Sequence, residues 1–267
     1  SLNQLQELNL ANNNLNKVPS EIINFISLIS LDLSNNIITD FSSLSNLINL
    51  EWLSLENNSL QNIPNQVNNL QKLIHLNLGR NKINGSTSIL GTLNHLQQLW
   101  LNHNKLSGNI PQDLLALPNL MCLSLQSNEL EGTIPNNIPQ ICNISNNRFS
   151  KTQIENYLNT NSNNTDFVYS PQRYDNPKVI KANLNSSTSL DQALSTSDGY
   201  SFTWLKTLDK NTYINSENLS ISSVKETDFD IYTCEAIFIK NDTLYNIYFS
   251  DYREPITLEK DETLSTE

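Results

Sequence analysis

The residues of this chain that are best suited to chemistry are few, and their spacing matches no common catalytic or metal-binding pattern. The histidines stand at positions 75, 95 and 103, without the HExxH spacing by which two histidines hold zinc. His75 and His103 with Glu56 could form a ligand set or an acid–base pair, but a solvated polar surface is the simpler interpretation. Among only six glycines there is neither a GxSxG motif nor a phosphate-binding loop. The sequence therefore predicts a protein that is not an enzyme and that carries no cofactor.

Charge and hydrophobicity argue against several kinds of partner. The chain has 16 basic and 27 acidic residues, a formal net charge of −11, which makes nucleic acid or an anionic membrane an unfavourable partner. No apolar run approaches the length of a membrane-spanning helix, so we expect no membrane insertion by this region. The acidic cluster of Glu226, Asp228 and Asp230 lacks the glycine and closing glutamate of a calcium loop, and we interpret it as a turn.

A repeated unit marked by asparagine must position any functional residues of the first 150 positions. The motif LxxLxLxxNxL begins with Leu5, Leu8, Leu10 and Asn13 and returns about every 23 residues. Its asparagines, called the frame asparagines below, are Asn13, Asn36, Asn58, Asn81, Asn104, Asn128 and Asn147. The LxL element places two leucines on one face of a short strand, and the asparagine amide can satisfy backbone groups where the chain turns. Stacked copies predict a solenoid with a parallel sheet on one side and a continuous leucine core.

This motif resembles the leucine-rich repeat family over residues 1 to about 150. The resemblance implies an α/β solenoid with a parallel sheet on its concave face and short helical turns on its convex face. Two repeats end in LSGNIP (106–111) and LEGTIP (130–135), which are similar to the LxGxIP form of plant receptors and many bacterial surface proteins. That form implies an extracellular or cell-surface location. Ser150 and Gln153 have capping-box spacing, so a short helix is expected to close the solenoid.

The composition changes after the solenoid, and we place a domain boundary near residue 174. The first domain, 1–174, includes a capping segment over about 150–174, and the second covers 175–267. Trp204, Tyr232 and Cys234 in the second domain have a spacing that resembles an immunoglobulin-like domain. By that resemblance Trp204 is the core tryptophan and Tyr232 is the tyrosine-corner residue of an all-β sandwich.

The cysteines predict no disulfide. The position where an immunoglobulin-like domain carries the partner of Cys234 falls in the stretch Leu190 to Gln192, which holds no cysteine. In the repeat frame Cys122 faces outward and Cys142 faces the core, which argues against their pairing. We interpret all three as free or buried thiols.

The concave sheet is the expected binding surface, because its outward side chains are not needed for the core. Most are small and polar, but the central repeats carry bulky ones, and tryptophan and arginine are common interface anchors. With strands about 4.8 Å apart, the two tryptophans should stand roughly 10 Å from each other across His75. The candidate site residues are Trp52, His75, Arg80, Trp100, His103, Glu56, Asn77 and Asn102.

The sequence thus predicts a non-catalytic recognition module that binds a protein, peptide or glycan. The order of repeats, a connector FVYSPQ (167–172) and an immunoglobulin-like module is similar to a layout of large bacterial cell-surface proteins. We therefore expect a fragment of a surface or secreted protein, for example one that serves adhesion. The alternatives are a structural spacer or stalk with no ligand of its own and, third, a hydrolase.

Overall fold

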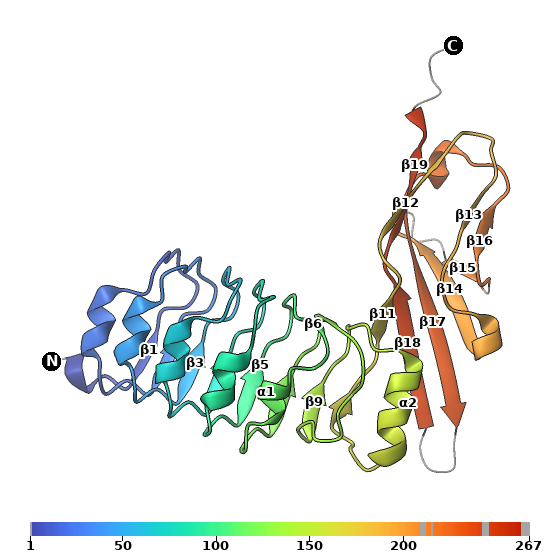
Figure 1. Cartoon of the computed structure of the whole chain (residues 1–267). Helices are drawn as coiled ribbons and strands as arrows, with labels where there is room; N and C mark the ends of the chain where they lie inside the picture. The colour runs from blue at the N-terminus through green and yellow to red at the C-terminus, as the bar shows by residue number, and fades with distance from the viewer. Residues whose placement is uncertain (1, 209–211, 215, 242–245, 263–267) are drawn as a thin grey trace. The chain divides into compact units, whose positions relative to one another are not determined.

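A computed structural model of the chain describes residues 2–208, 212–214, 216–241 and 246–262. The chain divides into two compact units, Ser1–Tyr169 and Ser170–Glu267 (Figure 1). The predicted boundary near residue 174 lies five positions later than this division. The difference arises because Gln172–Tyr174 forms strand β11, which pairs with β18 of the second unit.

A parallel sheet runs through the first unit, and its strands follow one another in sequence order. The strands are β1 (Glu7–Asn9), β2 (Ser30–Asp32), β3 (Trp52–Ser54), β4 (His75–Asn77), β5 (Gln98–Trp100), β7 (Cys122–Ser124), β9 (Ile141–Asn143) and β10 (Phe167–Val168). The frame therefore predicted the stacking correctly. The eighth strand was not predicted, because Phe167–Val168 belongs to no repeat and joins the sheet only by pairing with β9.

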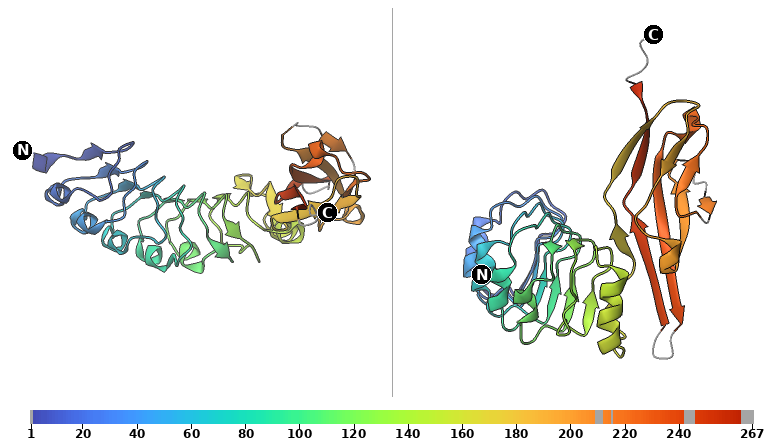
Figure 2. Two further views of the ribbon diagram at one scale, coloured as in Figure 1. Left: turned by 90° about the horizontal axis from the view of Figure 1, so that it is seen from above. Right: turned by 45° about the vertical axis from the view of Figure 1, so that its right-hand side comes forward.

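Short helices lie on the side of the first unit opposite the sheet, and the unit curves with the sheet on its inner face (Figure 2). They are η1 (Leu2–Gln4), η2 (Ser20–Asn24), η3 (Ser42–Asn46), η4 (Asn65–Asn69), η5 (Ser88–Thr92) and α1 (Gln112–Leu115). All except the four-residue α1 are 3-10 helices of three to five residues, the usual length of that helix type. A second small sheet pairs β6 (Ser107–Gly108) with β8 (Glu129–Leu130).

The leucines of the frame form the core of the first unit. Leu31, Leu53 and Leu76 are completely buried, whereas Leu8 is only half-buried because β1 has a neighbouring strand on one side alone. Helix α2 (Lys151–Thr160) begins as predicted with a capping box: Gln153 N donates to Ser150 Oγ, and Ser150 N donates to Gln153 Oε1 at 2.8 Å.

The described residues of the second unit form strands and two short 3-10 helices, η6 (Thr196–Asp198) and η7 (Glu226–Asp228). Its larger sheet has the order β11-β18-β17-β14-β15, with β19 pairing both β17 and β12, while β13 pairs with β16 separately. The bounds are β11 (Gln172–Tyr174), β12 (Lys178–Ala182), β13 (Thr188–Leu190), β14 (Tyr200–Lys206), β15 (Thr212–Ile214), β16 (Leu219–Ile221), β17 (Ile231–Asn241), β18 (Asn246–Arg253) and β19 (Ile256–Lys260).

The core of the second unit is centred on Trp204. It lies directly opposite Cys234 in the β14–β17 pair, and both residues are fully buried. The indole Nε1 of Trp204 donates to the carbonyl of Ser216 at 3.1 Å, so its one polar group is satisfied. Leu190 is also fully buried, and Cys122, Cys142 and Cys234 are all free thiols. In the described residues, no helix is long and apolar enough to cross a membrane.

Candidate binding surface on the concave sheet

Strands β3, β4 and β5 carry the three bulky side chains of the candidate site, in two different rows. Trp52 lies opposite His75, but Trp100 lies opposite Asn77, two positions further along the strand. The expectation that the tryptophans face each other directly across His75 is therefore wrong. Two strand spacings combined with two residues along the strand put their Cα atoms about 12 Å apart rather than 10 Å. The reason is that tryptophan occupies the first position of β3 but the last position of β5.

Both tryptophans are half-buried, as is His75, so they stand on the surface with part of each ring covered by neighbours. The central residue of each strand, such as Leu53, faces the core and is fully buried. Because successive side chains of a strand point to opposite faces, the first and third residues of each strand point away from the core and onto the concave face. The tryptophans are thus less exposed than the sequence led us to expect, but they remain accessible.

A polar network joins three of the predicted residues beside these rings. The Asn77 amide donates to Glu56 Oε2 at 3.0 Å, and Arg80 Nε lies 3.3 Å from Glu56 Oε1. The two charged side chains are 58% and 33% exposed, so their attraction contributes at most about 1 kcal/mol. Its main consequence is positional, since the guanidinium is held beside the sheet.

Gly79 brings the asparagines of neighbouring repeats together. A Cβ atom at Gly79 would lie 2.8 Å from Asn102 Oδ1 and 3.1 Å from Asn77 Oδ1, so no larger residue fits without displacing them. The backbone N–H of Gly79 also donates to Asn77 Oδ1 at 2.9 Å. Gly79 therefore belongs to the site although the prediction did not include it. The available signal was a glycine at a position where the other repeats carry a side chain.

Arg80 and His103 occupy equivalent positions at the carboxyl edge of the sheet. Each has a left-handed backbone conformation, with φ of 55° and 53°, where most other repeats carry asparagine. This conformation is uncommon for an arginine. Each backbone N–H is bonded to the next repeat, Arg80 N to Asn102 O at 2.8 Å and His103 N to Gln126 O at 2.9 Å. The two side chains therefore project from a backbone that neighbouring repeats hold in place.

The electrostatics of His103 show that it lies within reach of this network. Partial burial lowers the pKa of the His103 imidazole, the positive charge of Arg80 lowers it further, and Glu56 acts in the opposite direction. The lowered pKa favours the neutral imidazole, which can both donate and accept a hydrogen bond. The structure thus brings Glu56, Asn77, Arg80, Asn102 and His103 together at one edge of the patch.

His75 does not join the other titratable groups. Within the described part of the chain, no hydrogen bond or ion pair links His75 to His103 or to Glu56. The acid–base arrangement considered from the sequence is therefore not assembled. No group of three or more His, Cys, Asp or Glu side chains that could hold a metal ion occurs in the described residues.

Gln126 is a further residue that the predicted site omitted. Its Oε1 atom is buried and has no hydrogen-bond partner, which in the described residues is true of only one other side-chain atom, Tyr174 Oη. Buried acceptors are normally paired. The backbone N–H of His103 donates to the carbonyl of Gln126, so the unpaired Oε1 atom of Gln126 lies at the border of the same patch.

Comparisons with known proteins agree with the repeat structure. Models of the leucine rich repeat family match residues 3–60, 95–117 and 119–141. A search of curated proteins found no significant match. A leucine-rich repeat protein of Leptospira interrogans has a similar structure, with 28% sequence identity and a TM-score of 0.54, over 62% of this chain and 43% of that one.

Two plant structures are similar at lower scores. A plant ice-binding protein has 27% identity and a TM-score of 0.47, over 53% of this chain and 49% of that one. The plant peptide hormone receptor RGFR1 in complex with RGF2 has 28% identity and a TM-score of 0.46, over 65% of this chain and 31% of that one. The chain thus spans less than half the length of each of these three structures. The first unit thus contains leucine-rich repeats, because its stacked parallel strands and frame asparagines agree with the family models that match three stretches of it.

Proposed function

We propose that the leucine-rich repeat unit recognises a protein or peptide on its concave sheet, through the patch formed by Trp52, His75 and Trp100 and the adjoining network of Glu56 and Arg80. Leucine-rich repeat domains are typical protein-interaction modules. The observation that carries the proposal is the concentration of bulky and charged side chains on β3, β4 and β5 and the turns that follow these strands.

The concave patch is preorganised for binding. The rings stand on strands that are paired on both sides, and Glu56 holds the Arg80 guanidinium at 3.3 Å. A ligand therefore meets groups that lose little freedom on binding, which is a main determinant of affinity. The diagonal spacing of the tryptophans, about 12 Å, suits side chains three or four residues apart on an extended peptide.

Binding can be tested with an array of peptides and glycans, since aromatic rings also serve sugar ligands, followed by affinity measurements on the full chain. The change Trp100→Ala should weaken binding of a hit by about 2 kcal/mol, roughly thirtyfold in Kd. Ser30→Ala, on the same face in β2, is the matched control and should leave Kd within about twofold. Hits that survive the double change Trp52→Ala, Trp100→Ala would place the site elsewhere. An array without hits would favour a structural spacer.

We also propose that the second unit is an immunoglobulin-like sandwich without a disulfide. The burial of Trp204 opposite Cys234 supports it, as does Tyr232, whose Oη donates to the carbonyl of Asp228 at 2.7 Å, a tyrosine-corner bond. The pairing of β13 with β16, apart from the sheet of β14, β17 and β18, is the division into two sheets that this fold requires. An experimental structure in which the β13–β16 pair does not cover Trp204 would overturn the assignment.

The location at the cell surface or outside the cell is likewise a proposal. It is supported by the LxGxIP endings of two repeats. The glycines of these endings, Gly108 and Gly132, have the left-handed backbone conformation that glycine adopts without strain. Protease treatment of intact source cells should degrade a surface protein and spare an internal one. Complete protection until the cells are lysed would refute this location.

A further inference from the structure

A recurring hydrogen bond fixes the backbone just after the strands of the concave sheet. In it, the side chain of the last strand residue accepts from the backbone N–H two positions further along the chain. Five of the seven repeats make this bond, at 2.9 to 3.4 Å, from the N–H groups of Ala11, Ser34, Glu56, Gly79 and Ser145 to the side chains of Asn9, Asp32, Ser54, Asn77 and Asn143. Because these acceptor side chains stand on the concave face, the N–H groups point toward that face.

The bond is missing in the two adjacent repeats whose strands end with Trp100 and Ser124. An indole has no acceptor atom, so Trp100 cannot bond to the N–H of Asn102. The hydroxyl of Ser124 makes no bond to the N–H of Gln126, and neither N–H has another acceptor in the described part of the chain. Two unpaired backbone donors therefore face the concave surface in neighbouring repeats.

The side chains of the same two residues are unpaired as well. No hydrogen bond to another described residue fixes the amide of Asn102 or of Gln126, and both residues are half-buried. Each amide is therefore free to turn its NH₂ group toward a ligand. Polar groups removed from water are normally paired, so a ligand that supplies acceptors would complete this region.

Arg80 adds a positive charge beside these donors. Its Nε lies 3.3 Å from Glu56 Oε1, while the terminal nitrogens of the guanidinium have no partner among the described residues. Its backbone N–H donates to Asn102 O at 2.8 Å, which places Arg80 in the repeat next to the first unpaired donor. Residues 97–106 and 120–128, which form the two strands and the turns after them, contain no acidic side chain.

We propose that the donor cluster, formed by the N–H groups and side-chain amides of Asn102 and Gln126 together with Arg80, binds a carboxylate of the peptide ligand. This inference rests on the proposed function and names a chemical group that the ligand carries. The two N–H groups stand about one strand spacing apart, roughly 4.8 Å, so each oxygen of a carboxylate can accept from one of them. A charged acceptor forms the stronger bond. The carboxylate can belong to an acidic side chain or to a free C-terminus.

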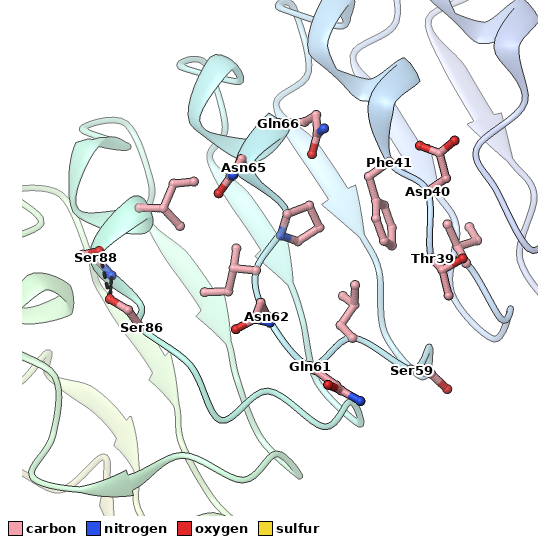
Figure 3. A pocket seen from close by; sticks show the side chains of 15 residues that line it. Thr39, Asp40, Phe41, Ser59, Gln61, Asn62, Asn65, Gln66, Ser86 and Ser88 are labelled. Carbon is pink, nitrogen blue, oxygen red and sulfur yellow. Dashed lines mark hydrogen bonds between the residues drawn. The ribbon is translucent and has the colours of Figure 1, made fainter.

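A hollow on the flank of the solenoid has the opposite character. It measures about 880 Å³, and Thr39, Gln61 and Ser88 are among the residues that line it (Figure 3). Its only charged lining residue is Asp40, which accepts from Ser42 N at 2.9 Å and has Lys17 beside it. A carboxylate ligand would meet a like charge there. The backbone amides of this hollow therefore serve as a negative control.

NMR titration of the full chain tests the donors without any peptide. Sodium acetate should move the amide proton signals of Asn102 and Gln126 downfield, because a carboxylate is a strong acceptor. Acetamide, a neutral molecule of similar shape, should move them much less. The amide signal of Gln61, beside the flank hollow, should stay in place. Equal shifts with acetate and acetamide, or shifts as large at Gln61 as at Gln126, would overturn the proposal.

Restoring the missing bond should close half of the site. Ser124→Asn introduces the side chain that Asn143 uses to bond to Ser145 N in the next repeat. The Gln126 amide signal should then lie downfield without acetate and no longer respond to it. Ser124→Ala adds no acceptor and is the matched control, in which the response should persist. An acetate response of Gln126 that is unchanged in Ser124→Asn, or lost equally in both variants, would contradict the assignment.

Array peptides that bind the full chain identify the source of the carboxylate. Each is remade with its Asp and Glu residues changed to Asn and Gln, and separately with its C-terminus amidated. Loss of the bound carboxylate should weaken binding about tenfold, as expected for hydrogen bonds to a charged group. The change that causes the loss shows whether the carboxylate is a side chain or a C-terminus.

The outcomes separate this inference from the proposed function. Peptides that bind the concave patch with equal affinity after both changes would refute the carboxylate site and leave the proposed function standing. An array without peptide hits would refute the proposed function, whereas acetate-specific shifts at Asn102 and Gln126 would still support the donor cluster.

Discussion

The replacement Asn81→Ala tests most directly how the frame asparagines hold the solenoid together. The Asn81 side chain is 8% exposed and makes bonds on both sides of its amide. Its Oδ1 accepts from Leu60 N at 3.1 Å, and its Nδ2 donates to the carbonyls of Leu55, Leu78 and Gly79 at 3.0, 3.1 and 3.0 Å. One side chain thus joins the repeat of Asn58 to the repeat of Asn81.

These four bonds do not contribute equally. The carbonyls of Leu55, Leu78 and Gly79 each keep a second donor when Asn81 is removed. Those donors are Asn58 Nδ2, Asn104 Nδ2 and Asn57 N. Only the N–H of Leu60, a residue that is 6% exposed, loses its sole partner. An unsatisfied buried donor costs about 1 to 3 kcal/mol, so we expect Asn81→Ala to lower the free energy of unfolding by about 2 to 3 kcal/mol.

The matched control is Asn13→Ala, at the same frame position in the first repeat. Asn13 is exposed, and its amide only donates, to the carbonyls of Leu10 and Ala11 at 2.9 and 3.0 Å. No described backbone N–H depends on its Oδ1, so its loss should cost less than about 1 kcal/mol.

Urea unfolding followed by circular dichroism would give both free energies, and hydrogen exchange at Leu60 would report the lost bond directly. Equal destabilisation by Asn81→Ala and Asn13→Ala, or unchanged exchange at Leu60, would refute the reasoning.

Three further predictions concern the cysteines, Tyr232 and His103. Dithiothreitol should leave thermal unfolding unchanged, and a thiol reagent at neutral pH should label one cysteine quickly and two slowly. The two slow cysteines are Cys142 and Cys234, because burial raises the pKa of Cys142 to about 12 and that of Cys234 to about 11. The fast cysteine is Cys122, which is only half-buried. A downward shift of the melting temperature with reductant would reveal a covalent link. Tyr232→Phe should destabilise the second unit by about 1 to 2 kcal/mol through loss of the bond to Asp228 O, and an unchanged urea midpoint would contradict this. By NMR, His103 should titrate below pH 6.5, and Arg80→Ala should raise its pKa; a shift in the opposite direction would show that the charge of Arg80 does not lower the His103 pKa. Because the folded pKa is the lower one, this histidine should reduce stability as the pH falls below its unfolded value.

The order of the sheet could be predicted from the sequence because contacts in a solenoid join residues one repeat apart. The frame therefore encodes its own long-range pairing, and Leu31 and Leu53 are neighbours because they occupy the same place in successive copies. The capping box at Ser150 is equally local, since a helix start is specified within four residues. The motif that placed Trp204 opposite Cys234 is likewise carried by sequence spacing.

The composition of the candidate surface could be listed from the same frame, but not its internal arrangement. The frame identifies which residues leave the core, and it gave Glu56, Asn77 and Arg80 without showing that one carboxylate joins the other two. Whether Glu56 contacts Asn77 and Arg80 depends on the rotamers of these side chains and on the space left by Gly79.

Tertiary structure alone decided the features that depart from the repeat. Strand β10 pairs outside the frame, and Gln172–Tyr174 belongs to the second unit because of β18, far along the chain. Neither pairing joins equivalent positions of two frame repeats, so no local pattern encodes it, and the folded chain alone decides it.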